Sequence, residues 1–289
     1  MTTLLGYESD ELAARDGADT AREIAQQPAV WRAIARDRAA ADDRFVADLL
    51  RRPELRIVLT GAGSSAFAGR VLAPLLSGRL ARRVDAVAST DIVAAPREHL
   101  AEDVPTLLVS LARSGDSPES VAATRLAEGR LSECFHLVVT CNRDGALAHE
   151  HSGRTRSRVL LLPAIANDRG FAMTSSFTGM MLAARLALDG APVEVEPLAA
   201  AAEHVLHAHL EDARALAATG CSRLVYLGSG ALQGLAAESA LKALELTAGG
   251  VVALSDSALG FRHGPKSVLD ERTLVAVFES TDPYTRRYD

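Results

Sequence analysis

Residues 56–65, Arg56-Ile-Val-Leu-Thr-Gly61-Ala-Gly63-Ser64-Ser65, set a short apolar strand directly before a Gly-x-Gly turn and the start of a helix. The same arrangement recurs at residues 223–230, Arg223-Leu-Val-Tyr-Leu-Gly228-Ser-Gly230, at a constant offset of 167 residues. An internal repeat of a strand–turn–helix opening is typical of a duplicated α/β domain. The 289 residues of the chain leave room for one large or two modest domains.

Short Val- and Leu-rich strands alternate with helices in the first copy. After residues 56–60, further strands are expected at Val84–Ala88, Thr106–Ser110, His136–Thr140 and Val159–Leu162. Continuous apolar strands of this kind are typical of a parallel sheet covered on both faces. A helix over Thr174–Leu188 and a long connector over Pro197–Thr219 follow.

The second copy reaches its third strand at Thr273–Phe278 and a helix near Asp282, and the chain stops at Asp289. We therefore expect this copy to be an incomplete domain. The sequence predicts an α/β protein with an N-terminal helical segment at residues 1–53, a first domain at 54–210 and a partial second domain at 211–289.

Composition excludes several classes of function. The formal net charge of −6, without a stripe of basic residues, argues against a nucleic-acid partner. No apolar run approaches the ~20 residues of a membrane span, and the acidic N-terminus is unlike a signal peptide. Three cysteines show no metal-ligand spacing and are interpreted as buried thiols in a reducing cytoplasm: Cys134, Cys141 and Cys221. Three histidines of one predicted helix are interpreted as solvated: His204, His207 and His209.

Hydroxyl side chains gather at two helix starts of the first copy. Ser64 and Ser65 follow the first strand, and Arg113, Ser114 and Ser117 follow the third. Serine often only caps a helix. Two such loops at the carboxyl edge of a parallel sheet, with free N–H groups and an arginine, instead favour a site for a phosphate monoester. The second copy has Ala231 and Leu232 where the first has Ser64 and Ser65, so it has lost this site.

Only two of the 31 basic residues are lysines, and both lie in the second copy. Lys242 shares one predicted helix face with Glu238 and Glu245, at spacings i, i+4 and i+7. The plainer interpretation is a surface salt-bridge ladder, and Lys266 is equally explained as a surface residue. Lysine can give up its proton whereas arginine stays charged. Together with His263 in a Gly- and Pro-bounded loop, Lys242 and Glu245 suit proton transfer between carbons and the opening of a sugar ring.

These residues resemble the sugar isomerase (SIS) domain superfamily in its double-domain form. The similarity is greatest to the tagatose-6-phosphate ketose/aldose isomerase family, also described as galactosamine-6-phosphate deaminase/isomerase. It is carried by six stretches that span nearly the whole chain: residues 61–69, 108–120, 140–145, 167–178, 238–249 and 260–266. The resemblance implies a flavodoxin-like three-layer α/β/α arrangement in each half, a homodimer, and no metal or organic cofactor.

A more distant similarity to the isomerase half of glucosamine-6-phosphate synthase implies roles for individual residues. Four residues would hold the phosphate, Ser65, Arg113, Ser114 and Ser117, with Thr174 near the sugar. Glu245 would move the proton between C1 and C2, Lys242 would steady its charge, and His263 would open the ring, reaching over from the other subunit. This chain departs from the pattern in two respects: the distant relative uses a lysine near its C-terminus and no lysine follows Lys266 here, and the family is longer by about a further half-domain.

The expected activity is a cytoplasmic deaminase/isomerase acting on a 2-amino-2-deoxyhexose 6-phosphate such as galactosamine 6-phosphate. A plain aldose–ketose isomerase would use the same proton transfer without loss of ammonia. A third class keeps the phosphate site without catalysis, as a sugar-phosphate sensor in a regulator. A regulator would carry a helix-turn-helix with a basic face, and residues 8–53 are too acidic and irregular for one.

Overall fold

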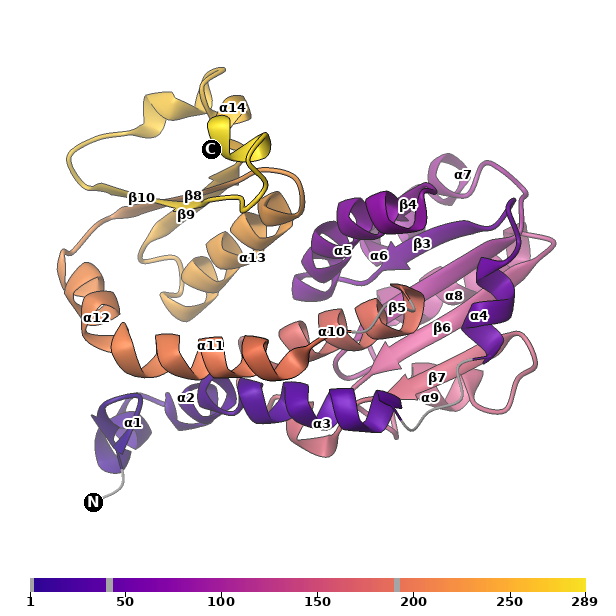
Figure 1. Ribbon diagram of the computed structural model, residues 1–289, viewed down its shortest axis with the longest axis horizontal. Coiled ribbons are helices and arrows are strands. Elements are labelled where there is room, and N and C mark those ends of the chain that lie inside the picture. The colour runs from indigo at the N-terminus through magenta and orange to yellow at the C-terminus, as the bar shows by residue number, and fades with distance from the viewer. Residues whose placement is uncertain (1–2, 40–43, 190–192) are drawn as a thin grey trace.

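The computed structural model describes residues 3–39, 44–189 and 193–289 of the chain. It contains two parallel sheets, as predicted (Figure 1). The strands of the larger sheet lie in the spatial order β4 (Val84–Ala86), β3 (Arg56–Thr60), β5 (Thr106–Ala112), β6 (Cys134–Thr140) and β7 (Ser157–Leu161). Because β3 lies between β4 and β5, the strand order reverses there, and ligands of doubly wound sheets bind outside the carboxyl ends at such a point.

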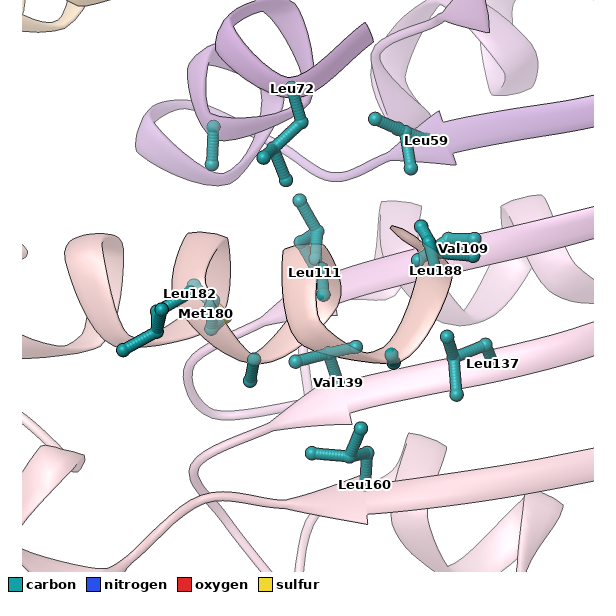
Figure 2. Packing of buried hydrophobic residues seen from close by; sticks show 14 of the residues in the cluster. Leu59, Leu72, Val109, Leu111, Leu137, Val139, Leu160, Met180, Leu182 and Leu188 are labelled. Atoms are coloured by element: carbon teal, nitrogen blue, oxygen red, sulfur yellow. The ribbon is translucent and has the colours of Figure 1, made fainter. Parts of the chain in front are cut away.

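The larger sheet is the middle of three layers. Along β3, Ile57 and Leu59 pack into the main hydrophobic core, whereas Val58 faces a second core on the other side. The main core is closed by α5 (Ser64–Leu80) and α10 (Ser175–Asp189), and Figure 2 shows α10 side chains such as Met180 facing the strand residues. The other face is covered by α6 (Ser89–Ala94), α8 (Pro118–Arg130) and α9 (Ala146–His151), and α7 (Pro96–His99) follows α6.

The N-terminal segment is helical, as predicted, but begins with a hairpin that the sequence analysis did not anticipate. The hairpin pairs β1 (Thr3–Leu4) with β2 (Tyr7–Glu8). The helices are α1 (Ser9–Ala14), α2 (Ala18–Ala25), α3 (Gln27–Ala39) and α4 (Arg44–Leu50). Side chains of α3 and α4, among them Val30 and Val46, are buried in the main core of the larger sheet. The segment is therefore built into the first half.

The predicted connector consists of two helices, α11 (Val195–Ala208) and α12 (Leu210–Ala218). It leads to a smaller parallel sheet in the order β10 (Thr273–Phe278), β8 (Arg223–Gly228) and β9 (Val252–Asp256). One long helix, α13 (Ala231–Leu246), lies between this sheet and α5 (Figure 1). Short turns complete the second half: α14 (Ala258–Phe261), η2 (Pro265–Val268) and η3 (Thr285–Arg287).

Two expectations need correction. The helix predicted near Asp282 is only the 3₁₀ turn η3, because the Asp282 carboxylate accepts hydrogen bonds from the N–H and hydroxyl of Thr285 and so closes a tight turn. Of the three thiols, Cys134 and Cys141 are buried, whereas Cys221 is only half-buried at the start of the smaller sheet. In the described ranges, no helix is long and apolar enough to cross a membrane.

The backbone confirms the repeat seen in the sequence. Gly63 before α5 has φ 56° and ψ −127°, and Gly230 before α13 has φ 58° and ψ −124°. Positive φ favours glycine at both positions. The preceding glycine of each turn is crowded: a Cβ on Gly61 would lie 2.8 Å from the carbonyl oxygen of Leu111, and one on Gly228 would lie 2.5 Å from that of Leu232. Both halves therefore open with the same turn.

Candidate active site

The loops after β3 and β5 surround a hollow of about 130 Å³ where the strand order of the larger sheet reverses. Four of the residues expected to hold a phosphate line it: Ser65, Arg113, Ser114 and Ser117. Ala62 at the start of α5 and Met173 before α10 complete its wall. We call this hollow the cradle. It brings together the two helix N-termini and the hydroxyl and guanidinium groups that bind a phosphate monoester in other proteins.

The capping role of serine accounts for only part of this arrangement. Ser117 is the N-cap of α8: its hydroxyl oxygen accepts the N–H of Ser120 and its O–H donates to the Ser120 hydroxyl, 2.7 Å away. The N-cap of α5 is Gly63, so neither Ser64 nor Ser65 caps that helix. The hydroxyl of Ser65 is thus left for another role, and it lies in the wall of the cradle.

The cradle loop that follows β5 is held in place by the loop that follows β6. The amide of Asn142 donates to the carbonyl of Ser114 over 3.0 Å, and the carboxylate of Asp116 accepts the N–H of Ala146 over 2.8 Å. Gly145 packs so closely that a Cβ there would lie 2.2 Å from the carbonyl oxygen of Ser114. The loop therefore has a fixed shape before any ligand binds, which lowers the entropic cost of binding.

A further loop, at residues 167–174, contacts the cradle through Arg113. The Arg113 guanidinium donates a hydrogen bond to the carbonyl oxygen of Gly170 over 3.0 Å. The buried carboxylate of Asp168 accepts the N–H groups of Thr174 and Ser176, both over 2.8 Å, and so fixes Thr174 at the start of α10. Thr174 itself does not line the hollow, although Met173 does. The position of Thr174 near the sugar stays a prediction.

Glu23 of α2 holds the same loop from the N-terminal segment. Its carboxylate is 4% exposed and accepts the N–H groups of Arg169, over 2.5 Å, and Gly170, over 3.1 Å. The sequence analysis identified neither Glu23 nor Asp168. Asp168 had a local signal, a carboxylate shortly before a Ser- and Thr-rich helix start. Glu23 had none, because its partners lie more than a hundred residues along the chain.

The charged face of α13 is not a solvated ladder. The side chain of Lys242 is 18% exposed, and it contacts both the Glu245 carboxylate and, at 3.4 Å, the Glu238 carboxylate. Glu238 is the most buried of the three. Its burial raises the pKa of its carboxyl to about 7, against the opposing effects of Lys242 and Ser64. Partly buried charges that share one lysine are typical of functional sites.

Because α13 packs on α5, the face of α13 that holds Glu238, Lys242 and Glu245 lies toward the cradle. Gly234 lies against the backbone of α5 near Val71, where a Cβ would come within 2.7 Å of the Val71 nitrogen, and Glu238 contacts Ser64 at the start of α5. The two helices are therefore antiparallel. Glu245 lies seven residues beyond Glu238, roughly 10 Å further along the helix axis at 1.5 Å per residue. This direction leads past the N-terminus of α5, to the edge of the sheet where the cradle lies.

His263 is exposed in the loop between α14 and η2. Within the described residues its side chain makes no hydrogen bond or ion pair, and only its backbone N–H is bonded, to Gly260. Lys266, the second lysine, is likewise exposed. A single chain thus brings together the cradle and the face of α13 but does not join His263 to them. This is the residue that the resemblance assigned to the neighbouring subunit.

Known proteins resemble the chain over most of its length. The SIS domain family matches residues 49–189. An AgaS protein of Streptomyces coelicolor is 61% identical over 93% of this chain and 72% of its own length. The D-galactosamine-6-phosphate deaminase AgaS of a Shewanella species is 46% identical over 93% and 71%, respectively. The crystal structure of tagatose-6-phosphate ketose/aldose isomerase from Escherichia coli superposes with a TM-score of 0.84 at 44% identity, covering 95% of this chain and 77% of that one.

Proposed function

This chain belongs to the SIS domain family, among the AgaS proteins, and we propose that it converts D-galactosamine 6-phosphate and water to tagatose 6-phosphate and ammonia. The observation that carries the proposal is the cradle beside α13: a rigid anion site next to a buried Glu–Lys–Glu face. An anion site fixes the substrate by the phosphate that does not react. The carboxylates then act at the other end of the sugar.

Binding starts with the phosphate in the cradle. The hydroxyls of Ser65 and Ser114, the guanidinium of Arg113 and the N-terminus of α8 supply donors and positive potential. When the phosphate binds, the O–H of Ser117 turns from the Ser120 hydroxyl and donates to the phosphate at the same helix start. The fixed loop shape supports an orientation in which C1 and C2 point along the cradle opening, toward the end of α13 that holds Glu245.

The chemical steps follow from the groups available. His263 opens the pyranose ring and releases the C1 aldehyde. Glu245 takes the proton from C2 and returns it to C1 through a cis-enolamine, which leaves an imine at C2. Water adds to the imine carbon, ammonia leaves, and the C2 ketone remains. Proton transfer of this kind is general acid–base catalysis, worth about 10²–10⁴-fold in rate.

Lys242 steadies the charge of Glu245, because its ammonium contacts that carboxylate and faces no other charge in the described residues than Glu238. Glu238 acts through Lys242. With a pKa near 7, it is ionised only in part at neutral pH, so it need not draw the lysine away from Glu245. The pair of carboxylates therefore has divided roles, with Glu245 reacting and Glu238 positioning.

We further propose that the active enzyme is a homodimer. His263 faces solvent within its own chain, whereas ring opening requires it beside the sugar. A neighbouring subunit that inserts this loop beside the cradle would complete the site. Exposed apolar side chains on the outer face of the smaller sheet, among them Val275 and Val277, support the view that further protein covers this half.

The decisive test follows two products from one substrate. Incubation with galactosamine 6-phosphate should release ammonia and tagatose 6-phosphate in equal amounts, each measured by a coupled enzymatic assay. The related crystal structure named as a ketose/aldose isomerase favours one alternative, a plain isomerase. Such an enzyme would interconvert galactose 6-phosphate and tagatose 6-phosphate and release no ammonia from the amino sugar. Tight binding of sugar phosphates without any turnover would instead identify a sensor.

A further inference from the structure

A second cluster of chemically active side chains lies at the opposite edge of the larger sheet. Glu128 near the end of α8, His136 of β6 and His151 at the end of α9 offer ligand atoms that all lie within 4.8 Å of one another. Cys134, at the amino end of β6, places its sulfur 3.4 Å from Nε2 of His136. The cradle lies at the carboxyl ends of the strands, so this cluster takes no part in the proposed reaction.

Both histidine side chains are almost fully buried, although each has a ring nitrogen that no hydrogen bond satisfies in the described residues. Each is 1% exposed. In the described part of the chain, Nε2 of His151 and Nδ1 of His136 have no hydrogen-bond partner. A buried polar atom left without a partner destabilises the folded state. The rings also pack closely, with centroids 4.4 Å apart. The free Nε2 of His151 is therefore suited to bind a metal ion, whereas His136 turns its Nε2 toward Glu128 and Cys134 and leaves Nδ1 without a partner.

We propose that Glu128, Cys134, His136 and His151 bind a divalent first-row metal ion, with Zn²⁺ preferred. The donor set of two imidazoles, a thiolate and a carboxylate is one that zinc takes in proteins. Nε2 of His136 lies 3.2 Å from the Glu128 carboxylate and 3.4 Å from the Cys134 sulfur. In a tetrahedral zinc site with bonds of ~2.0–2.3 Å, neighbouring ligand atoms lie ~3.3–3.6 Å apart. The two spacings at His136 therefore match those of a metal-bound set, whereas the Cys134 sulfur lies outside the group of atoms within 4.8 Å of one another and would move toward the ion on binding.

The surroundings support the same assignment. Nδ1 of His151 lies 3.0 Å from the hydroxyl of Ser157, a partner that orients the ring while Nε2 stays without a hydrogen-bond partner in the described residues. Such an outer partner is typical of metal-binding histidines. Arg154 competes with the ion, since its guanidinium lies 2.8 Å from the Glu128 carboxylate; its side chain is 45% exposed and is free to turn into solvent. An ion here would join α8, β6 and α9 and so stabilise the first half.

Metal binding is measured on the whole chain after treatment with a chelator. Calorimetric titration should show one equivalent of Zn²⁺, and Co²⁺ should give the absorption bands of a tetrahedral site with a thiolate-to-metal charge-transfer band. Zn²⁺ should also raise the midpoint of thermal unfolding, as any ligand of the folded state does. His151→Gln should abolish the Zn²⁺ heat. The matched control is His209→Gln, which removes an exposed histidine and should leave binding unchanged.

Three milder variants keep the test valid if His151→Gln fails to fold. Cys134→Ser should remove the charge-transfer band, and Ser157→Ala should weaken Zn²⁺ binding ~10–100-fold, the usual effect of removing an outer partner. Arg154→Ala should tighten it, because a competing cation is gone. The proposal is overturned if the wild-type chain binds no Zn²⁺, or if binding is lost equally in His209→Gln. It is also overturned if the site proves insensitive to Ser157→Ala and Cys134→Ser.

Discussion

The two halves of the molecule begin with the same turn but bury their sheets very differently. Gly63 and Gly230 share their backbone angles to within a few degrees. All seven residues of β5 in the first sheet are buried, whereas β10, its counterpart in the second sheet, has no fully buried residue. A shared local motif therefore fixes the start of each half without fixing how completely the half is packed.

The polar and charged side chains expected to act on the substrate also differ between the two halves. The first half keeps Ser64 and Ser65 after its Gly-x-Gly turn, and Ser65 lines the cradle. The second half has Ala231 and Leu232 at those positions, and its charged groups lie further along the helix, at Lys242 and Glu245. The turn alone therefore does not make a phosphate site. The side chains that follow it determine whether a phosphate can bind there. On our proposal one half anchors the substrate and the other transforms it.

The largest expected effect comes from removing the reactive carboxylate of the second half. Glu245→Gln keeps the shape and removes the basicity, so turnover should fall by ~10²–10⁴-fold while the sugar phosphate still binds. Rates of product formation, substrate affinity and deuterium exchange at the carbon next to the carbonyl measure this. Exchange that survives in the variant would reduce Glu245 to an ion-pair partner of Lys242.

Mixing two inactive variants tests whether the residues of one active site come from two subunits. Glu245→Gln and His263→Ala should each be nearly inactive alone. If these residues act from opposite chains, a heterodimer regains one intact site of its two, and activity returns on mixing. Subunit exchange is followed by native mass spectrometry as a control. Proven exchange without recovered activity would place both residues in the same site of one chain.

The comparison of the two turns is sharpened by matched serine variants. Ser65→Ala removes the cradle hydroxyl that follows the first Gly-x-Gly turn, and a hydrogen bond to a charged group contributes about 1.5–3 kcal/mol, so KM should rise ~10–100-fold at 1.4 kcal/mol per factor of ten. The matched control is Ser229→Ala, in the second Gly-x-Gly turn, which should leave KM unchanged. A crystal soaked with sulfate should show the anion in the cradle. An anion bound at Gly228–Gly230 instead would reverse the assignment of the halves.

The smallest effect concerns the buried carboxyl between the halves. The pKa of Glu238 is raised from 4.5 to about 7 by burial. The folded state therefore holds this proton more tightly than the unfolded chain. Its contribution to stability is complete below about pH 4.5 and is lost as the pH rises through about 7. Compared with wild type, Glu238→Gln should show a smaller fall in the unfolding midpoint over this range. Parallel curves for the two proteins would mean that the Glu238 carboxyl binds its proton no more tightly in the folded state than in the unfolded chain.

Much of the fold was predictable because its signals are local. Strands β3 and β10 begin and end where the apolar runs predicted, because short runs rich in Val, Ile and Leu favour an extended chain even where, as in β10, burial is incomplete. The hairpin at residues 3–8 was missed because each of its strands has only two residues, too few for a periodic pattern. Likewise, the turn at Asp282 depends on one side chain that satisfies the backbone locally.

The sequence by itself determined the duplicated α/β fold, the residues at the two helix starts and the spacing of Glu238, Lys242 and Glu245, because strand periodicity, helix periodicity and turn chemistry act between near neighbours. Only the tertiary structure decided that Glu23 supports the loop at Gly170, that the face of α13 is largely buried and directed toward the cradle, and that His136 and His151 meet under α8. Those relations depend on how helices cross and which atoms lose contact with water, and neither property is written in the spacing of residues along the chain.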